Sequence, residues 1–209
     1  MMRIESVSAS PDRVGRYKVT LEDGSVLRLY RQTVQDFLLY PGKELGDEEL
    51  ESLYTAAGAM SAKMRAVRII SASNVAKRDL EQRLIQKGED PAQARDAVAW
   101  LSEMSLVDDA KTAQNVVEHC IRKGYGKARA KQALYEKRIP KEYWEDALSD
   151  YPDQEDAIES FLRQRLTDPE DERAVKKAID ALIRRGHSYG NIRRVLQRLC
   201  VDNDLLEDV

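Results

Sequence analysis

The sequence predicts a mainly α-helical protein, with tandem three-helix repeats in a curved array that follow a small antiparallel β-hairpin module. Two observations carry this prediction. A helical pattern of apolar residues recurs along the chain and places Leu84, Leu134 and Leu196 at one repeat position. Alternation of apolar and polar residues, which is typical of strands, is confined to the first 30 residues. Because a short helical unit cannot bury its apolar stripe alone, the repeats must stack on one another.

Residues 1–58 are expected to form a small α+β module. Apolar residues alternate with polar ones on both sides of the Asp23-Gly24 pair, which is typical of a hairpin turn. Short helices are expected to follow over residues 33–39 and 48–57. The module has no histidine, no cysteine and no phosphate-loop pattern. It is therefore interpreted as a docking or capping element.

The rest of the chain is expected to be helical, in repeats over residues 59–106, 107–151 and 152–209. Breaks between helices are expected near residues 71–74 and 88–91 in the first repeat and at 124–126 and 138–140 in the second, where the 50-residue shift puts them. A further break is expected at residues 167–169 in the third repeat. The third repeat lies a further 62 residues along the chain, so that Leu206 corresponds to Trp144. The chain ends soon after this position, and the last helix of the third repeat should therefore be shortened.

Composition excludes several classes of protein. The 34 Lys and Arg against 37 Asp and Glu give a net charge of −3 over 209 residues, so bulk charge does not draw the molecule to nucleic acid or to a membrane. The sequence lacks a signal peptide and the roughly 18 successive apolar residues of a membrane span. We therefore expect a cytoplasmic protein. Cys120 and Cys200, on apolar helix faces, are expected to be reduced and to act as small hydrophobic residues.

Enzyme chemistry is not expected. His119 and His187 occupy repeat positions that do not correspond, and no Cys or His spacing is typical of a zinc site. The Asp108-Asp109 pair is interpreted as the start of a helix, where carboxylates complement the free backbone N–H groups. The sequence thus predicts no catalytic residues, no cofactor and no metal.

Positive charge gathers in the second repeat, where residues 122–138 contain seven basic residues and one acid. Equivalent positions of the third repeat are also basic. Such a stripe would attract a phosphate backbone or an acidic protein surface, although an ordinary solvated helix face is the alternative. The residues expected to contact a partner or nucleic acid are Arg122, Lys123, Tyr125, Lys127, Arg129, Lys131, Arg185, Arg193 and Arg194.

Three segments carry a family resemblance: Ala76-Lys77-Arg78-Asp79-Leu80, the helix end and cap Met104-Ser105-Leu106-Val107-Asp108-Asp109-Ala110, and a stretch from Arg122-Lys123-Gly124 to Arg138-Ile139-Pro140. In combination they resemble the RecX family of recombinase regulators, over roughly residues 60–206. The first 55 or so residues are similar to the N-terminal β extension of the longer members.

The resemblance implies a non-enzymatic modulator of RecA, the filament-forming ATPase of homologous recombination. Similar proteins are thought to lie along the groove of the RecA filament on single-stranded DNA and to impede its growth. That implies a role in recombination, DNA repair and the SOS response, with the filament as partner and single- or double-stranded DNA contacted weakly. We expect a monomer. Two alternatives stay open: a stand-alone DNA-binding helical-repeat protein, and a general helical adaptor for another protein.

Overall fold

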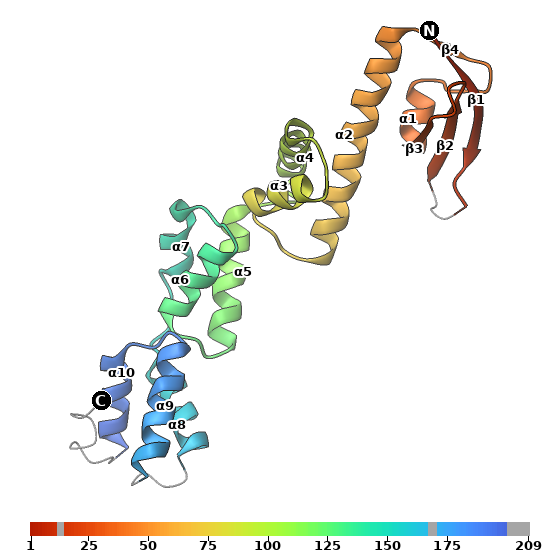
Figure 1. Ribbon diagram of the computed structural model, residues 1–209. Coiled ribbons are helices and arrows are strands. Elements are labelled where there is room, and N and C mark those ends of the chain that lie inside the picture. The colour runs from red at the N-terminus through yellow and green to blue at the C-terminus, as the bar shows by residue number, and fades with distance from the viewer. Residues whose placement is uncertain (12–14, 167–170, 200–209) are drawn as a thin grey trace. The chain divides into compact units, whose positions relative to one another are not determined.

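The computed structural model describes residues 1–11, 15–166 and 171–199. Strands come first and helices follow (Figure 1), so the prediction of a mainly helical chain with a small N-terminal antiparallel sheet is confirmed. Cys200, the break expected at residues 167–169 and the shortened last helix all lie outside the described residues. The chain forms two compact units, Met1–Val107 and Asp108–Val209.

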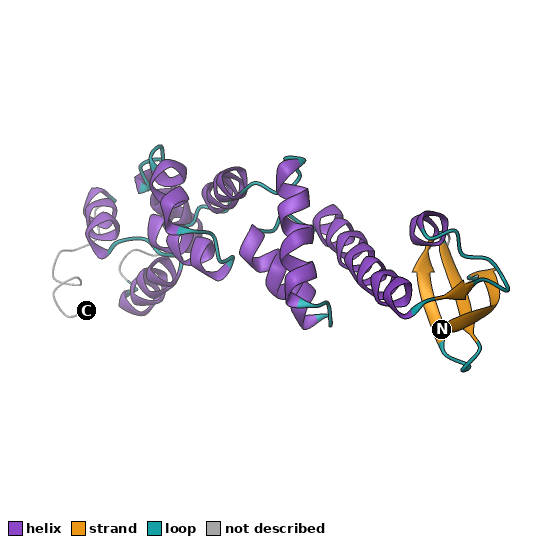
Figure 2. Cartoon of the chain, turned by 90° about the horizontal axis from the view of Figure 1, so that it is seen from above, coloured by secondary structure: helices purple, strands orange, loops and turns teal. Residues whose placement is uncertain are grey.

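The first unit opens with an antiparallel sheet in the order β3-β2-β1-β4. Its strands are β1 (Met2–Ala9), β2 (Arg16–Leu21), β3 (Val26–Tyr30) and β4 (Glu44–Leu45). Gly24 has a φ of +80°, as the expected hairpin turn requires. Helix α1 (Arg31–Asp36) packs against the sheet (Figure 2) and is shorter than the helix predicted over 33–39. The two-residue strand β4 was not predicted, because alternation cannot be recognised over so few residues.

Helix α2 (Asp47–Ala72) belongs both to the N-terminal module and to the first group of helices. The boundary expected between residues 58 and 59 falls inside this 26-residue helix, and the helix predicted over 48–57 is only its first part. Gly58 weakens a helix without ending it. Its missing side chain leaves room for Gln93, since a Cβ here would overlap the Gln93 amide. Gly58 is thus a point of close packing within a continuous helix.

The second half of α2 packs with α3 (Lys77–Gln86) and α4 (Pro91–Glu103). Their shared core includes Ala62, Ala66, Leu84 and Leu101. The Asp90 carboxylate accepts hydrogen bonds from the backbone N–H groups of Ala92 and Gln93, at 2.8 and 3.1 Å, and so begins α4. The breaks predicted near residues 71–74 and 88–91 are both present.

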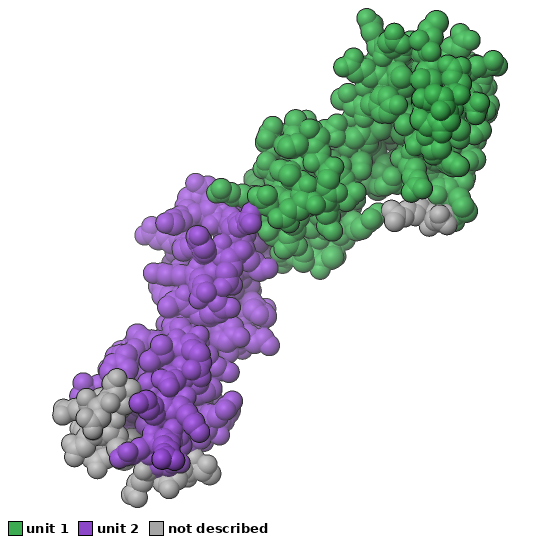
Figure 3. All heavy atoms as spheres, in the orientation of Figure 1, with its two compact units in different colours: residues 1–107 green, residues 108–209 purple. Residues whose placement is uncertain are grey.

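The second unit, drawn in purple in Figure 3, contains two groups of helices. The first group is α5 (Asp109–Arg122), α6 (Lys127–Glu136), the 3-10 turn η1 (Lys141–Tyr143) and α7 (Trp144–Leu148). The second is α8 (Glu155–Arg165), α9 (Glu172–Arg184) and α10 (Tyr189–Arg198), which share one apolar core. Leu84, Leu134 and Leu196 are all fully buried, as their common repeat position predicts.

Candidate functional site

The start of α5 positions the first group of helices in the second unit. The Asp108 carboxylate accepts a hydrogen bond from the backbone N–H of Lys111 at 3.1 Å, and Asp109 is the first residue of the helix. The acidic pair therefore acts as a helix start, as predicted. Val116, Val117 and other residues of the apolar face are buried, which fixes the face of α5 that points inward.

A groove lies between α6 and the segment that contains η1 and α7. Its volume is about 530 Å³. Lys127 and Lys131 are one helical turn apart on α6, and Lys141 comes from η1. Trp144 and Leu148 supply apolar surface. We call this feature the lysine groove and define it by Lys127, Lys131, Lys141, Trp144 and Leu148.

The side chains of the lysine groove suit an anionic partner. Among the described residues, none of its three lysines forms an ion pair, and Glu145 is the one acid in the lining. The indole N–H of Trp144 donates to the carbonyl of Ile139 at 3.0 Å, which holds the half-buried ring in place. Uncompensated cations beside a fixed aromatic ring can bind an acidic protein segment with an apolar side chain, or a phosphate strand with stacked bases.

Three of the residues expected to contact a partner form ion pairs with acids of their own chain. Arg122 lies 3.8 Å from Glu118, Arg129 lies 3.1 Å from Glu136, and Arg194 lies 2.9 Å from Glu155. Their charge is partly neutralised. Lys123, at the end of α5, and Arg193, on α10, are exposed and carry no ion pair in the described part of the chain.

Tyr125 and Arg185 lie instead at the junction between the two helix groups of the second unit. The Arg185 guanidinium stands 6.0 Å from the centre of the Tyr125 ring and 4.7 Å from that of Phe161. The Tyr151 hydroxyl donates to the Tyr125 carbonyl at 2.7 Å, and burial raises the pKa of Tyr151 to about 12, so this donor keeps its proton. Both predicted contact residues therefore contribute to packing within the unit.

The structure thus separates the predicted basic stripe into parts. It brings Lys127 and Lys131 together with Lys141, which lay outside the basic stretch considered in the sequence. Pro140 separates Lys141 from that stretch, and the 3-10 turn that follows returns the chain beside α6. The signal that could have identified Lys141 was its position three residues before Trp144, an aromatic residue interpreted only as packing.

His187 connects the same two helix groups. Its Nε2 atom lies 3.1 Å from the carbonyl oxygen of Gly124. A carbonyl can only accept, so Nε2 carries the proton, and Nδ1 is buried with no hydrogen-bond partner among the described residues. Burial lowers the pKa of His187, and the nearby Arg185 charge adds to the effect, while the bond to Gly124 opposes it.

Acid should therefore destabilise the second unit through His187. An unfolded histidine binds a proton near pH 6.5, whereas the folded one binds it only at lower pH. The unfolded state then holds more protons, so stability falls as the pH drops below about 6.5. The melting temperature should decrease from pH 7.5 to 5.5, and less steeply in His187→Gln, whose amide can still donate to Gly124. Equal slopes in both proteins would show that other groups carry the pH dependence.

The remaining residues with metal-binding or redox chemistry do not gather. Among the residues that the structure describes, no group of three or more His, Cys, Asp or Glu side chains could hold a metal ion. His119 is exposed, whereas Cys120 is buried and burial raises the pKa of its thiol. Within the same described ranges, no helix is long and apolar enough to cross a membrane.

Comparisons with known proteins agree with this architecture. Residues 108–148, which include the lysine groove as far as Leu148, match a family model described as RecX, second three-helix domain. The regulatory protein RecX of Clostridioides difficile (strain 630) is 27% identical over 204 residues, which cover 94% of each chain. The regulatory protein RecX of Stenotrophomonas maltophilia (strain R551-3) is 30% identical over 133 residues, or 62% of this chain and 82% of the relative.

Two solved structures share the fold. A crystal structure of regulatory protein RecX aligns with a TM-score of 0.64 at 22% identity, over 93% of this chain and 98% of that one. A crystal structure of RecX from Lactobacillus salivarius aligns with a TM-score of 0.58 at 21% identity, over 69% of this chain and 97% of that one. The first alignment extends over nearly the whole chain and therefore includes most of the N-terminal module.

Proposed function

The chain belongs to the RecX family of regulatory proteins, and from this premise we propose that it binds the RecA recombinase filament and inhibits its assembly and activities. It acts in the cytoplasm, in recombination, DNA repair and the SOS response. It does so as a regulatory protein and not as an enzyme. Its relatives are named for regulation and not for a reaction.

The lysine groove is the observation that supports this proposal most directly. Lys127, Lys131 and Lys141 surround an apolar surface, and no described acid neutralises them by an ion pair. Such a site favours an acidic segment of a protein surface that also offers an apolar side chain. Charge complementarity would speed the encounter and fix the orientation, while Trp144 and Leu148 supply buried area.

Tandem helix groups also suit a filament as partner. A filament presents the same surface at every protomer, and this chain presents related surfaces more than once: Lys131 on α6 and Arg193 on α10 are exposed at positions 62 residues apart. When two linked sites bind at once, the second event is intramolecular and the total affinity rises without any new kind of contact. We propose that these two repeats span residues 107–151 and 152–209.

Co-sedimentation with preassembled filaments tests the proposal. RecA is assembled on single-stranded DNA, the full chain is added, and the pellet is compared with that from the same DNA alone. We expect the protein to sediment with the filament and to be released as salt is raised. Equal recovery with bare DNA would favour the stand-alone DNA-binding protein, and no recovery with either would favour an adaptor for another partner.

A further inference from the structure

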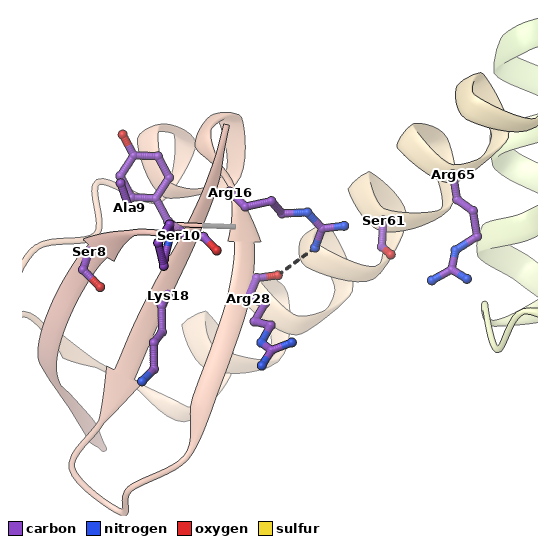
Figure 4. Close-up of a pocket in the computed structure, with 10 residues that line it drawn as sticks. Ser8, Ala9, Ser10, Arg16, Lys18, Arg28, Ser61 and Arg65 are labelled. Atoms are coloured by element: carbon purple, nitrogen blue, oxygen red, sulfur yellow. Dashed lines mark hydrogen bonds between the residues drawn. The ribbon is translucent and has the colours of Figure 1, made fainter. Parts of the chain in front are cut away.

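A second basic surface lies in the first unit, between the N-terminal sheet and α2. Arg16, Lys18 and Arg28 reach it from the sheet, and Arg65 reaches it from the helix (Figure 4). The pocket has a volume of about 530 Å³. We call it the N-terminal basic pocket and define it by these four residues. The sheet and the first half of α2 share one apolar core, which includes Leu29 and Leu53.

The strand register places two of these cations directly opposite each other. Lys18 on β2 pairs with Arg28 on β3, and Ser8 on β1 is the other neighbour of Lys18. Like charges at facing positions of an antiparallel pair destabilise the sheet. Neither side chain forms an ion pair within the described ranges. A local arrangement that costs stability without an internal partner is typical of a functional site.

The other two cations are held in fixed positions. The Arg16 guanidinium donates to the Tyr30 hydroxyl at 2.6 Å and to the Arg28 carbonyl at 3.4 Å, and it stacks 3.8 Å from the centre of the Tyr30 ring. All of these partners are neutral, and no acid in the described part of the chain forms an ion pair with Arg16. Arg65 forms an ion pair with Glu89 and donates to the Lys87 carbonyl at 3.0 Å.

The pocket is positive although its surroundings are acidic. Residues 1–60 contain 7 basic and 10 acidic residues, yet no described acidic residue lines the pocket. Positive charge is therefore concentrated on one face of a module whose overall charge is negative. A diffuse solvated surface would show both signs of charge interspersed.

We propose that the N-terminal basic pocket binds phosphate groups of a single nucleic-acid strand. Arginine guanidinium groups match phosphate oxygens with paired hydrogen bonds, and lysine adds a compact charge. The volume lies in the range of small-ligand sites, which suits one or two nucleotides and not a duplex. The proposal goes beyond the proposed function, because binding of a strand at this pocket does not involve the recombinase and can be tested without it.

Binding of a fluorescent 15-nucleotide oligo-dT to the full chain, followed by anisotropy over a range of salt, tests the pocket. The variant Lys18→Gln, Arg28→Gln should bind at least about tenfold more weakly. Its slope of log affinity against log salt should be shallower by about 1.4, since each lost phosphate contact on a single strand removes about 0.7. The melting temperature should be equal or higher, because the repulsion between the two cations is removed.

The matched control is Arg78→Gln, Arg95→Gln, which removes the same charge from exposed positions of the same unit outside the pocket. Its affinity should change less than about twofold. The wild type and the pocket variant are also compared in a background in which Lys127, Lys131 and Lys141 are changed to Glu. The pocket variant should lose affinity by the same factor in this background, because the free-energy effects of mutations at separate sites add. If the double variant does not fold, Arg28→Gln alone should show about half the change in slope.

Two results would overturn the proposal. Equal affinity of the pocket variant and the control would show that the pocket does not take a strand. Displacement of the labelled strand by ATP, or by poly-glutamate, at lower concentration than by unlabelled oligo-dT would show that a free nucleotide, or an acidic peptide, is the preferred occupant. Displacement by unlabelled oligo-dT at the lowest concentration supports the strand.

Discussion

Replacing Gly126 with alanine should disrupt the junction between the two helix groups of the second unit. A Cβ at this position would overlap the carbonyl group of Gly186 and the backbone nitrogen of His187. These are backbone atoms, which cannot move aside by changing rotamer. The Gly126 N–H also donates a hydrogen bond to the Arg185 carbonyl at 2.8 Å. The new methyl group would push these two backbone segments apart and so strain this hydrogen bond.

The expected loss is about 2–6 kcal/mol in the free energy of unfolding. Overpacking a tight contact costs about 1–3 kcal/mol. The hydrogen bonds Gly126 to Arg185 and His187 to Gly124 would also be lost, at about 0.5–1.5 kcal/mol each. Urea unfolding followed by circular dichroism measures the loss. It should appear either as a midpoint at lower urea concentration or as two separate unfolding transitions.

Gly190→Ala is the matched control for this substitution. Gly190 lies in α10, and a Cβ there would meet no atom within 4 Å. Alanine favours a helix over glycine by up to about 1 kcal/mol, so stability should stay equal or rise. A Gly126→Ala protein whose stability falls by less than about 0.5 kcal/mol would show that the two helix groups do not approach each other at this glycine.

The role of Gly126 shows where prediction from the sequence ends. Gly124-Tyr125-Gly126 was correctly interpreted as a break between helices, because glycine interrupts a helical pattern. The close approach to Gly186 depends on how two groups of helices pack. The spacing of residues within one segment of the sequence does not indicate such a contact. The close packing of Gly58 against Gln93 was not predicted for the same reason, since Gln93 comes from another helix.

The two basic surfaces differ in how far the sequence could have revealed them. In the N-terminal basic pocket, Lys18 and Arg28 stand at equal distances from Asp23 of the predicted hairpin turn, so the register could have been counted from the sequence. Arg65 could not have been added, because only the packing of α2 on the sheet brings it there. In the lysine groove, Lys127 and Lys131 were predicted, whereas Lys141 depended on the path of the chain after Pro140.

Reversing the three lysines of the lysine groove should weaken binding to RecA filaments while the fold stays intact. Lys127, Lys131 and Lys141 are exposed, and none forms an ion pair within the described part of the chain. Lys127 is also the first residue of α6, whose start has no side-chain cap, so glutamate there would complement the helix dipole. The charge change therefore acts on the partner and not on the core.

The triple variant Lys127→Glu, Lys131→Glu, Lys141→Glu is needed because a single exposed charge contributes only about 0.2–1 kcal/mol. Reversal replaces an attraction by a repulsion, so three changes together amount to about 1–6 kcal/mol. Affinity should fall roughly tenfold or more, as measured by co-sedimentation and by inhibition of filament-dependent ATP hydrolysis. Raised salt should weaken the wild type in the same direction.

The matched control reverses Lys111, Lys137 and Lys176, which are exposed lysines of the same unit outside the groove. Because it changes the net charge equally, any difference between the two triple variants reports the position of the charges and not their number. The control should inhibit nearly as well as the wild type. If instead the groove variant keeps its circular dichroism spectrum and inhibits ATP hydrolysis at wild-type potency, the lysine groove is a solvated face and the filament contacts another surface.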